Sequence, residues 1–170
     1  MSTVTVIGID PGSRNTGWGI VRETSGVLHL VECGVIRPST EGSFAERLGT
    51  IFWELHKVLE MYKPEEGAVE QVFTARNAGT ALKLGQARGA AVAALAAHRI
   101  PVHDYEPRLI KKSLVGVGGA EKSQVSYMVA RILGVKEDWA VDAGDALAAA
   151  ICHLSMRRFE RQMELGKTGR

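Results

Sequence analysis

Cysteine is scarce in this sequence, which contains only Cys33 and Cys152. The two do not form a CxxC pair, so the sequence predicts neither a disulfide scaffold nor a cysteine-based zinc site. We expect both to be small buried hydrophobic side chains in a reducing cytoplasm. The histidines are scattered without metal-ligand spacing, which favours packing or surface roles for each of them: His29, His56, His98, His103 and His153.

Long apolar runs are also missing. The longest, residues 89–97, is far shorter than the ~20 residues that span a bilayer. The first residues lack a charged segment followed by an apolar one, which excludes a typical secretory signal. We therefore expect a soluble cytoplasmic protein without a membrane partner. No internal repeat or linker is evident, so residues 1–170 are predicted to form a single domain, with a frayed tail over residues 160–170.

Two nucleotide-binding motifs can be excluded. The glycine-rich stretch before Lys122 resembles a P-loop, but Glu121 occupies the position that requires glycine and would repel phosphate. The glycines of residues 8–12 follow a predicted strand but precede another strand, whereas a dinucleotide fingerprint opens a helix.

Charge is unevenly distributed along the chain, although the net charge is only +2. Residues 1–71 have six Lys/Arg and ten Asp/Glu, a balance of −4, and residues 72–131 have nine against three, a balance of +6. The remaining six basic and six acidic residues cancel. A basic middle segment beside an acidic one suits a polyanion-binding surface around a metal centre, and a solvated surface explains the same charges equally well.

Strand and helix signals alternate along the chain. Three strands are predicted at residues 4–9, 16–21 and 27–36, and two more at 68–73 and 101–105. A capping box formed by Ser43 and Glu46 starts the first helix, which Lys63 and Pro64 end. Further helices are predicted at residues 78–97, 107–114, 122–133 and 141–159. This order predicts an α/β fold with a mixed sheet and helices on both of its faces.

Two acidic residues lie where an apolar core is expected. Asp10 ends the first strand, and Glu70 lies within an apolar run. A buried carboxylate is costly and needs an arginine, a hydrogen-bond network or a metal ion. Taken singly, Asp10 is also explained by bonding to its own turn, and Glu70 by a structural ion pair.

Asp142 and Asp145 are spaced so that both carboxylates share one face at the start of the last helix. Acids in a first helical turn also favour the helix dipole, which explains each of them without a ligand. That explanation leaves open why the first strand, the fourth strand and the last helix would all bring acids to one spot. The first and fourth strands are plausible parallel neighbours, and sites form at the carboxyl ends of such strands. Four oxygen donors favour Mg²⁺ or Mn²⁺, and two ions about 3.5–4 Å apart would support phosphodiester hydrolysis.

Several blocks of the sequence resemble the RuvC family of Holliday-junction resolvases in order and spacing. They are GIDPGSR at 8–14, TG at 16–17, EQVF at 70–73, Asn77, ALKLGQARG at 81–89, AEKSQV at 120–125 and DAGDALA at 142–148. The resemblance covers most of the chain. It implies a ribonuclease-H-like fold with a five-stranded mixed sheet, and a magnesium-dependent endonuclease that cuts four-way DNA junctions.

The resemblance assigns roles to individual residues. The catalytic, metal-binding acids correspond to Asp10, Glu70, Asp142 and Asp145. Phe73 is expected to stack on a junction base, a contact of ~1–3 kcal/mol. Lys111 and Lys122 are expected at phosphates beside the scissile bond, with further DNA contacts from Arg14, Arg76 and Lys83.

The resemblance also implies partners. Family members act as homodimers, nick two opposing strands symmetrically and work beside the RuvA–RuvB branch-migration complex. A two-fold dimer on a two-fold junction gives two cuts in strands of like polarity. We expect the small-residue helix at 78–97 to form the dimer contact.

Three other functions compete with this interpretation. An actin-like or sugar-kinase ATPase opens with a similar strand but needs two lobes, which 170 residues cannot supply. A ribonuclease-H relative that acts on RNA, and a non-catalytic junction-binding module, both stay open at the level of sequence.

Overall fold

The computed structural model describes residues 3–71 and 77–168, without the side chains of 165–168. The strands are β1 (Thr3–Asp10), β2 (Thr16–Thr24), β3 (Val27–Ile36), β4 (Glu66–Glu70) and β5 (Val102–Tyr105). The helices are α1 (Phe44–Tyr62), α2 (Ala78–Ala97), α3 (Pro107–Val115), α4 (Lys122–Leu133) and α5 (Val141–Thr168). All five predicted strands and all five predicted helices are confirmed, with shifted bounds in several cases.

The strands form one mixed sheet in the order β3-β2-β1-β4-β5. The first three are an antiparallel meander, and the turn between β2 and β3 uses the left-handed conformations of Ser25 and Gly26. β4 pairs with β1 in parallel, and β5 pairs with β4 in parallel. The expected parallel neighbourhood of the first and fourth strands is therefore confirmed.

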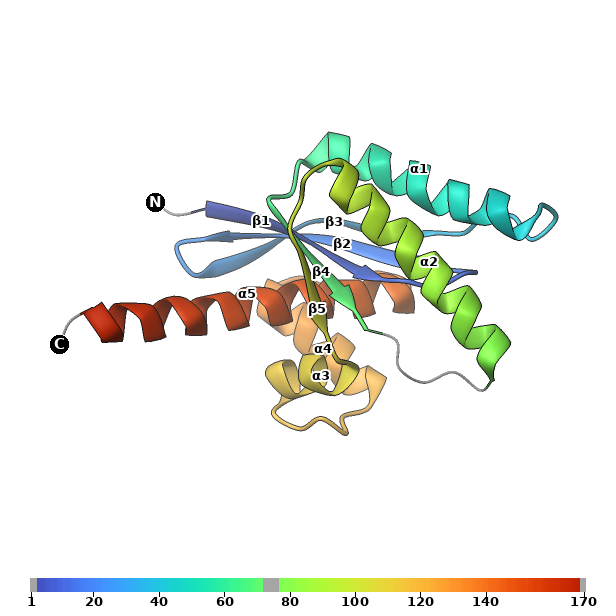
Figure 1. The fold of residues 1–170 in the computed structure, drawn as a ribbon. Coiled ribbons are helices and arrows are strands. Elements are labelled where there is room, and N and C mark those ends of the chain that lie inside the picture. The colour runs from blue at the N-terminus through green and yellow to red at the C-terminus, as the bar shows by residue number, and fades with distance from the viewer. Residues whose placement is uncertain (1–2, 72–76, 169–170) are drawn as a thin grey trace.

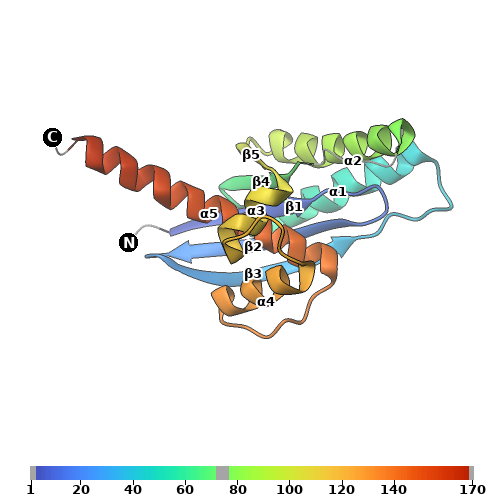
Figure 2. The ribbon, with the colours of Figure 1, turned by 90° about the horizontal axis from the view of Figure 1, so that it is seen from below.

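Helices cover both faces of the sheet, with α1 and α2 on one side and α3, α4 and α5 on the other (Figures 1 and 2). Side chains alternate between these faces along β1. Val4 and Val6 pack into the core with α3–α5, whereas Ile7 and Ile9 pack into the core with α1 and α2. The same period turns Asp10 toward α5.

Local capping sets the start of α1 as the sequence predicted. The Ser43 hydroxyl accepts a hydrogen bond from the Glu46 amide at 3.2 Å, and the Glu46 carboxylate accepts one from the Ser43 amide at 2.5 Å. The helix ends at Tyr62, and the left-handed backbone of Lys63 caps it. Asn77 caps the start of α2, where its side-chain oxygen accepts a hydrogen bond from the Thr80 amide at 2.9 Å.

The predicted strand at 68–73 differs from β4, which begins two residues earlier and ends at Glu70. Glu70 is thus the last residue of the strand, where its side chain reaches the sheet edge, and not an interior residue. Beyond it, the Gln71 amide still donates to the Tyr105 carbonyl at 2.8 Å.

The last helix is longer than the predicted 141–159, because residues 160–168 continue α5. Residues 160–165 are almost all strong helix formers, and ion pairs from Arg157 to Glu66 and from Arg158 to Glu23 attach the preceding turn to the sheet. Although α5 has 28 residues, no helix in the described parts of the chain combines the length and apolar character needed to cross a membrane.

Glycines let α5 lie directly on the sheet. A Cβ atom at residue 8 would lie 1.9 Å from the Ala146 carbonyl oxygen, and one at Gly17 would lie 1.9 Å from the Asp142 carbonyl oxygen. Only a residue without a side chain permits such an approach of helix backbone to strand backbone. The first turns of α5 are thereby held against β1 and β2.

We predict that Gly8→Ala lowers the free energy of unfolding by about 1–3 kcal/mol, because the added methyl group meets helix backbone that cannot rotate away. Urea denaturation measures this change. Gly49→Ala in α1 is the matched control, since nothing lies within 4 Å of its added methyl and alanine favours a helix by up to about 1 kcal/mol. Equal stability of the Gly8 variant and the parent would contradict the tight contact.

Candidate active site

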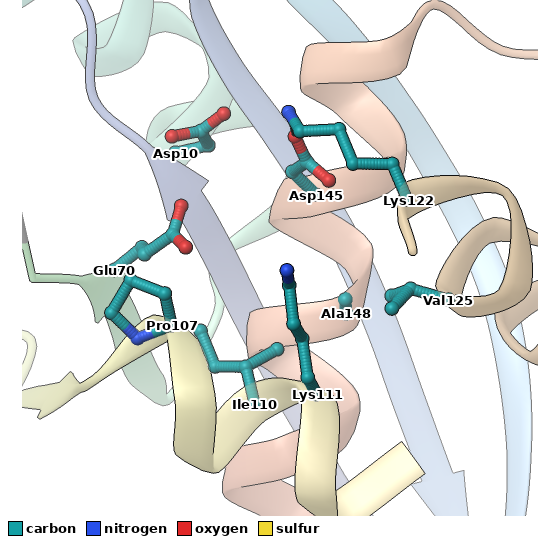
Figure 3. Close-up of a pocket in the computed structure, with 9 residues that line it drawn as sticks. All are labelled: Asp10, Glu70, Pro107, Ile110, Lys111, Lys122, Val125, Asp145 and Ala148. Carbon is teal, nitrogen blue, oxygen red and sulfur yellow. Dashed lines mark hydrogen bonds and ion pairs between the residues drawn. The ribbon is translucent and has the colours of Figure 1, made fainter. Parts of the chain in front are cut away.

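The carboxyl ends of β1 and β4 bring the first two acids together. Ile9 is in register with Val69, so Asp10 and Glu70 follow on adjacent parallel strands. Both side chains enter one pocket on the α5 face, where they lie next to each other (Figure 3). Residues 60 positions apart therefore meet because of sheet register.

The start of α5 supplies the other two acids. Asp145 lies opposite Asp10 and lines the same pocket (Figure 3). Asp142 lies one turn earlier, half-buried, and its charge acts on Asp10 although its side chain does not line the pocket. The backbone contacts of Gly8 and Gly17 with α5 fix this placement.

Two lysines complete the pocket. Lys122, the first residue of α4, places its ammonium nitrogen 2.7 Å from the Asp145 Oδ2 atom. Lys111 reaches the pocket from α3 (Figure 3). The apolar wall consists of Pro107, Ile110, Val125 and Ala148.

The pocket has a volume of about 210 Å³ and opens to solvent. Three acids that line it, Asp10, Glu70 and Asp145, offer only oxygen donors. Hard oxygen donors in this number suit Mg²⁺ or Mn²⁺, and no sulfur or nitrogen ligand that would select zinc lies among the lining residues. The donor chemistry therefore fits the divalent ion expected from the sequence.

Crowding of acids changes their ionisation. Burial, followed by the charges of Glu70, Asp145 and Asp142, raises the pKa of Asp10 to about 9. Burial also raises the pKa of Glu70 above its usual range. The hydrogen bond to Asp145 raises the pKa of Lys122. These carboxyls cannot all be charged at neutral pH without nearby positive charge, which the lysines supply in part and a cation would complete.

Among the sequence-predicted residues that the structure describes, Arg14 and Lys83 do not line the pocket. Arg14 is exposed in the loop after β1. Lys83 lies on α2, where its ammonium nitrogen is 6.0 Å from the centre of the Phe44 ring. Phe73 and Arg76 lie outside the described residues, so their roles stay predictions.

One positioning contact was missed from the sequence. The Arg47 guanidinium of α1 donates to the Ser13 carbonyl oxygen at 2.5 Å, and so ties the loop after Asp10 to a helix on the other face. Within that loop, the Thr16 hydroxyl donates to the Gly12 carbonyl at 2.8 Å. An arginine in an amphipathic helix gives no local signal of such a distant partner.

We predict that Asp10→Asn stabilises the metal-free protein. Asp10 ionises near pH 4 when unfolded but near pH 9 when folded, so its charge opposes folding increasingly as pH rises through that window. At pH 7.5 in EDTA the variant should be more stable by on the order of 2 kcal/mol, and near pH 4 the two proteins should be equal. Thermal and urea unfolding at both pH values test this.

The control is Glu41→Gln, which removes an exposed acid and should change stability little at either pH. An Asp10 variant that is no more stable than the parent at pH 7.5 would show that neither burial nor the neighbouring acids oppose the ionisation of Asp10 in the folded protein.

Known sequences resemble this chain along nearly its whole length. A family model described as Crossover junction endodeoxyribonuclease RuvC matches residues 6–153. The chain is 66% identical over 158 residues to the crossover junction endodeoxyribonuclease RuvC of Oleidesulfovibrio alaskensis, covering 93% of this chain and 95% of that protein. It is 65% identical over 166 residues to the same enzyme of Lawsonia intracellularis, covering 97% and 99%.

The fold has solved counterparts. Thermus thermophilus RuvC in complex with Holliday junction substrate superimposes with a TM-score of 0.87 at 35% identity, over 92% of this chain and 96% of that one. The ribonuclease-H-like architecture expected from the sequence is thus confirmed. By family model, by identity over almost all of its residues and by fold, this chain belongs to the crossover junction endodeoxyribonuclease RuvC family.

Proposed function

We propose that this chain, as a single nuclease domain, is a structure-selective endonuclease that resolves four-way DNA junctions by metal-dependent phosphodiester hydrolysis. One observation carries the proposal: acids from β1, β4 and α5 share a pocket with two lysines. Carboxylates hold a cation and ammonium groups bind a phosphate, so the pocket is suited to a phosphodiester.

Asp10, Glu70 and Asp145, with Asp142 at the rim, would hold Mg²⁺, of which we propose two ions, with Mn²⁺ able to substitute. Such ions lower the pKa of bound water and stabilise the leaving oxygen. The side chains themselves orient the site, since sheet register and the helix contact fix three carboxylates on different elements. No nucleophilic side chain is needed.

Lys111 and Lys122 would bind the phosphate beside the scissile bond. Lys122 now bonds Asp145, and a cation on that acid would leave its ammonium group to contact the phosphate. We propose that Arg14, Arg76 and Lys83 make further contacts with the DNA backbone, and that Phe73 stacks on a junction base.

We propose that the chain acts in the cytoplasm as a homodimer beside a RuvA–RuvB complex. The exposed face of α2 supports it as the dimer contact. Leu82 is 64% exposed, and nothing lies within 4 Å of a Cβ atom built on Gly85 or Gly89, so a second helix can approach closely.

The decisive test is Asp10→Asn on a synthetic mobile four-way junction. We expect Mg²⁺-dependent nicking to fall by more than about 100-fold. Loss of a residue that only orients a metal ligand costs up to about 100-fold, so a larger loss would mark Asp10 as a ligand itself. Junction affinity, measured by gel shift in EDTA, should be retained, because Asp10 makes no favourable contact with phosphate.

Retained nicking would refute the role of Asp10. Binding without nicking by the parent protein in Mg²⁺ would indicate the non-catalytic module. Faster cleavage of an RNA:DNA hybrid than of the junction would indicate the ribonuclease alternative.

Adjacent lysines on α3 provide a matched pair for the phosphate contact. Lys111 lines the pocket, whereas Lys112 is an exposed residue that does not line it. Lys111→Ala should lower single-turnover nicking by about 10–100-fold, through loss of a charge-assisted contact worth about 1.5–3 kcal/mol. Lys112→Ala should have little effect at the same salt concentration. Equal losses in the two variants would indicate only a general electrostatic role.

A further inference from the structure

A second cluster of ionisable side chains lies at the opposite end of β4. Glu66 begins β4, His103 lies on β5 and His153 on α5. One oxygen or nitrogen atom from each lies within 4.8 Å of the others. The three residues are far apart in sequence, which is why histidine spacing gave no hint of this cluster.

This cluster is separate from the acidic pocket, although both lie on the α5 face. Glu66 and Glu70 are four strand residues apart, about 13 Å. Asp145 and His153 are eight helix residues apart, about 12 Å. The acidic pocket and the second cluster are therefore separated by a similar distance along β4 and along α5. Ala68, which lies between Glu66 and Glu70 on β4, is buried.

His153 is held rigidly within the cluster. Its side chain is only 4% exposed. The ring places Nε2 2.5 Å from the Glu66 Oε2 atom and Nδ1 2.7 Å from the Tyr105 hydroxyl oxygen. Its centre lies 4.4 Å from the centre of the His103 ring. Two imidazoles and a carboxylate therefore converge on one spot.

Hydrogen bonds from neighbouring residues hold Glu66 and His153 in the orientation that metal ligands need. Arg157 Nε donates to the Glu66 Oε1 atom at 3.0 Å, and so leaves Oε2 directed at the histidines. The Tyr105 hydroxyl fixes the orientation of the His153 ring from its far side. Partners of this kind orient metal-binding carboxylates and imidazoles and set the histidine tautomer.

We propose that Glu66, His103 and His153 bind one zinc-class transition-metal ion, distinct from the ions of the nuclease centre. Two nitrogens and one carboxylate oxygen are the donor set of three-ligand zinc sites, with the fourth position left to water. With ligand bonds of about 2.0–2.2 Å, the Glu66 oxygen and the His153 nitrogen would exchange their mutual hydrogen bond for bonds to the ion and move slightly apart. The exposed His103 side chain would move toward them. His153 would coordinate through Nε2, with the ring proton on Nδ1 donated to the Tyr105 oxygen.

The bound ion would join β4, β5 and α5 at the end of the sheet remote from cleavage. Binding to the folded protein alone stabilises it by mass action. The ion would therefore act on stability, and the cleavage reaction would not depend on it.

The test uses full-length, untagged, EDTA-treated protein with Asp10→Asn, so that the acidic pocket is weakened as a competing site. Calorimetric titration with ZnCl₂ should give one site per chain, and the same titration with MgCl₂ should not fill it. His103→Ala in this background should weaken zinc binding by at least about tenfold. The matched control, His29→Ala, removes an exposed histidine of β3 and should change nothing.

Two further readouts separate this site from the nuclease centre. A hundredfold excess of zinc over Kd should raise the unfolding midpoint by roughly 5–10 °C, and His103→Ala should abolish that rise. With Asp10 intact, His103→Ala should still cut junctions in Mg²⁺. Absence of zinc uptake, or equal zinc affinity in the His103 and His29 variants, would overturn the proposal and leave a plain hydrogen-bond network.

Discussion

The approach of the α5 backbone to the glycines of β1 and β2 is the contact on which the rest of this molecule depends. It lets the helix carry Asp145 to the place where two parallel strands end with Asp10 and Glu70. Side chains at the glycine positions would lift the helix and separate the acids. The same contact allows the small, buried residues of α5 to pack as the central layer of one core.

Electrostatic repulsion among these acids opposes the fold that holds them. Burial and neighbouring charge favour the neutral form of Asp10, and the hydrogen bond from Lys122 goes to Asp145. Such a site is stabilised by what binds to it, which is the usual relation between an active site and the stability of its scaffold. The surrounding apolar core supplies the free energy that the acids oppose.

The sheet divides the molecule into two functional faces. The face covered by α3, α4 and α5 carries the acidic pocket at one end of β4 and the Glu66–His103–His153 cluster at the other. The opposite face carries α1 and α2, whose exposed small residues suit contact with a second copy. The sheet thus separates the proposed dimer contact from the acidic pocket, and the length of β4 separates that pocket from the proposed stabilising ion.

Much of the local structure was determined by the sequence alone. The capping box of Ser43 and Glu46 and the apolar periods along the chain predicted where elements lie, because these signals act over a few residues. The order of elements predicted the mixed sheet, and the placement of the acids singled them out. The family resemblance assigned the acids a joint role and added the two lysines. Helix formers beyond Phe159 were present but were outweighed in the prediction by their charge, and so the extent of α5 was missed.

Only the tertiary structure decided which distant residues meet. The end of β4 at Glu70, the bond from Arg47 to the loop after Asp10, and the meeting of His103 with His153 depend on strand register and on which face each residue occupies. Strand register and the face of each residue are not encoded within a short window of sequence. They are set by pairing between distant segments, in which a shift of one residue would turn each side chain to the other face of the sheet.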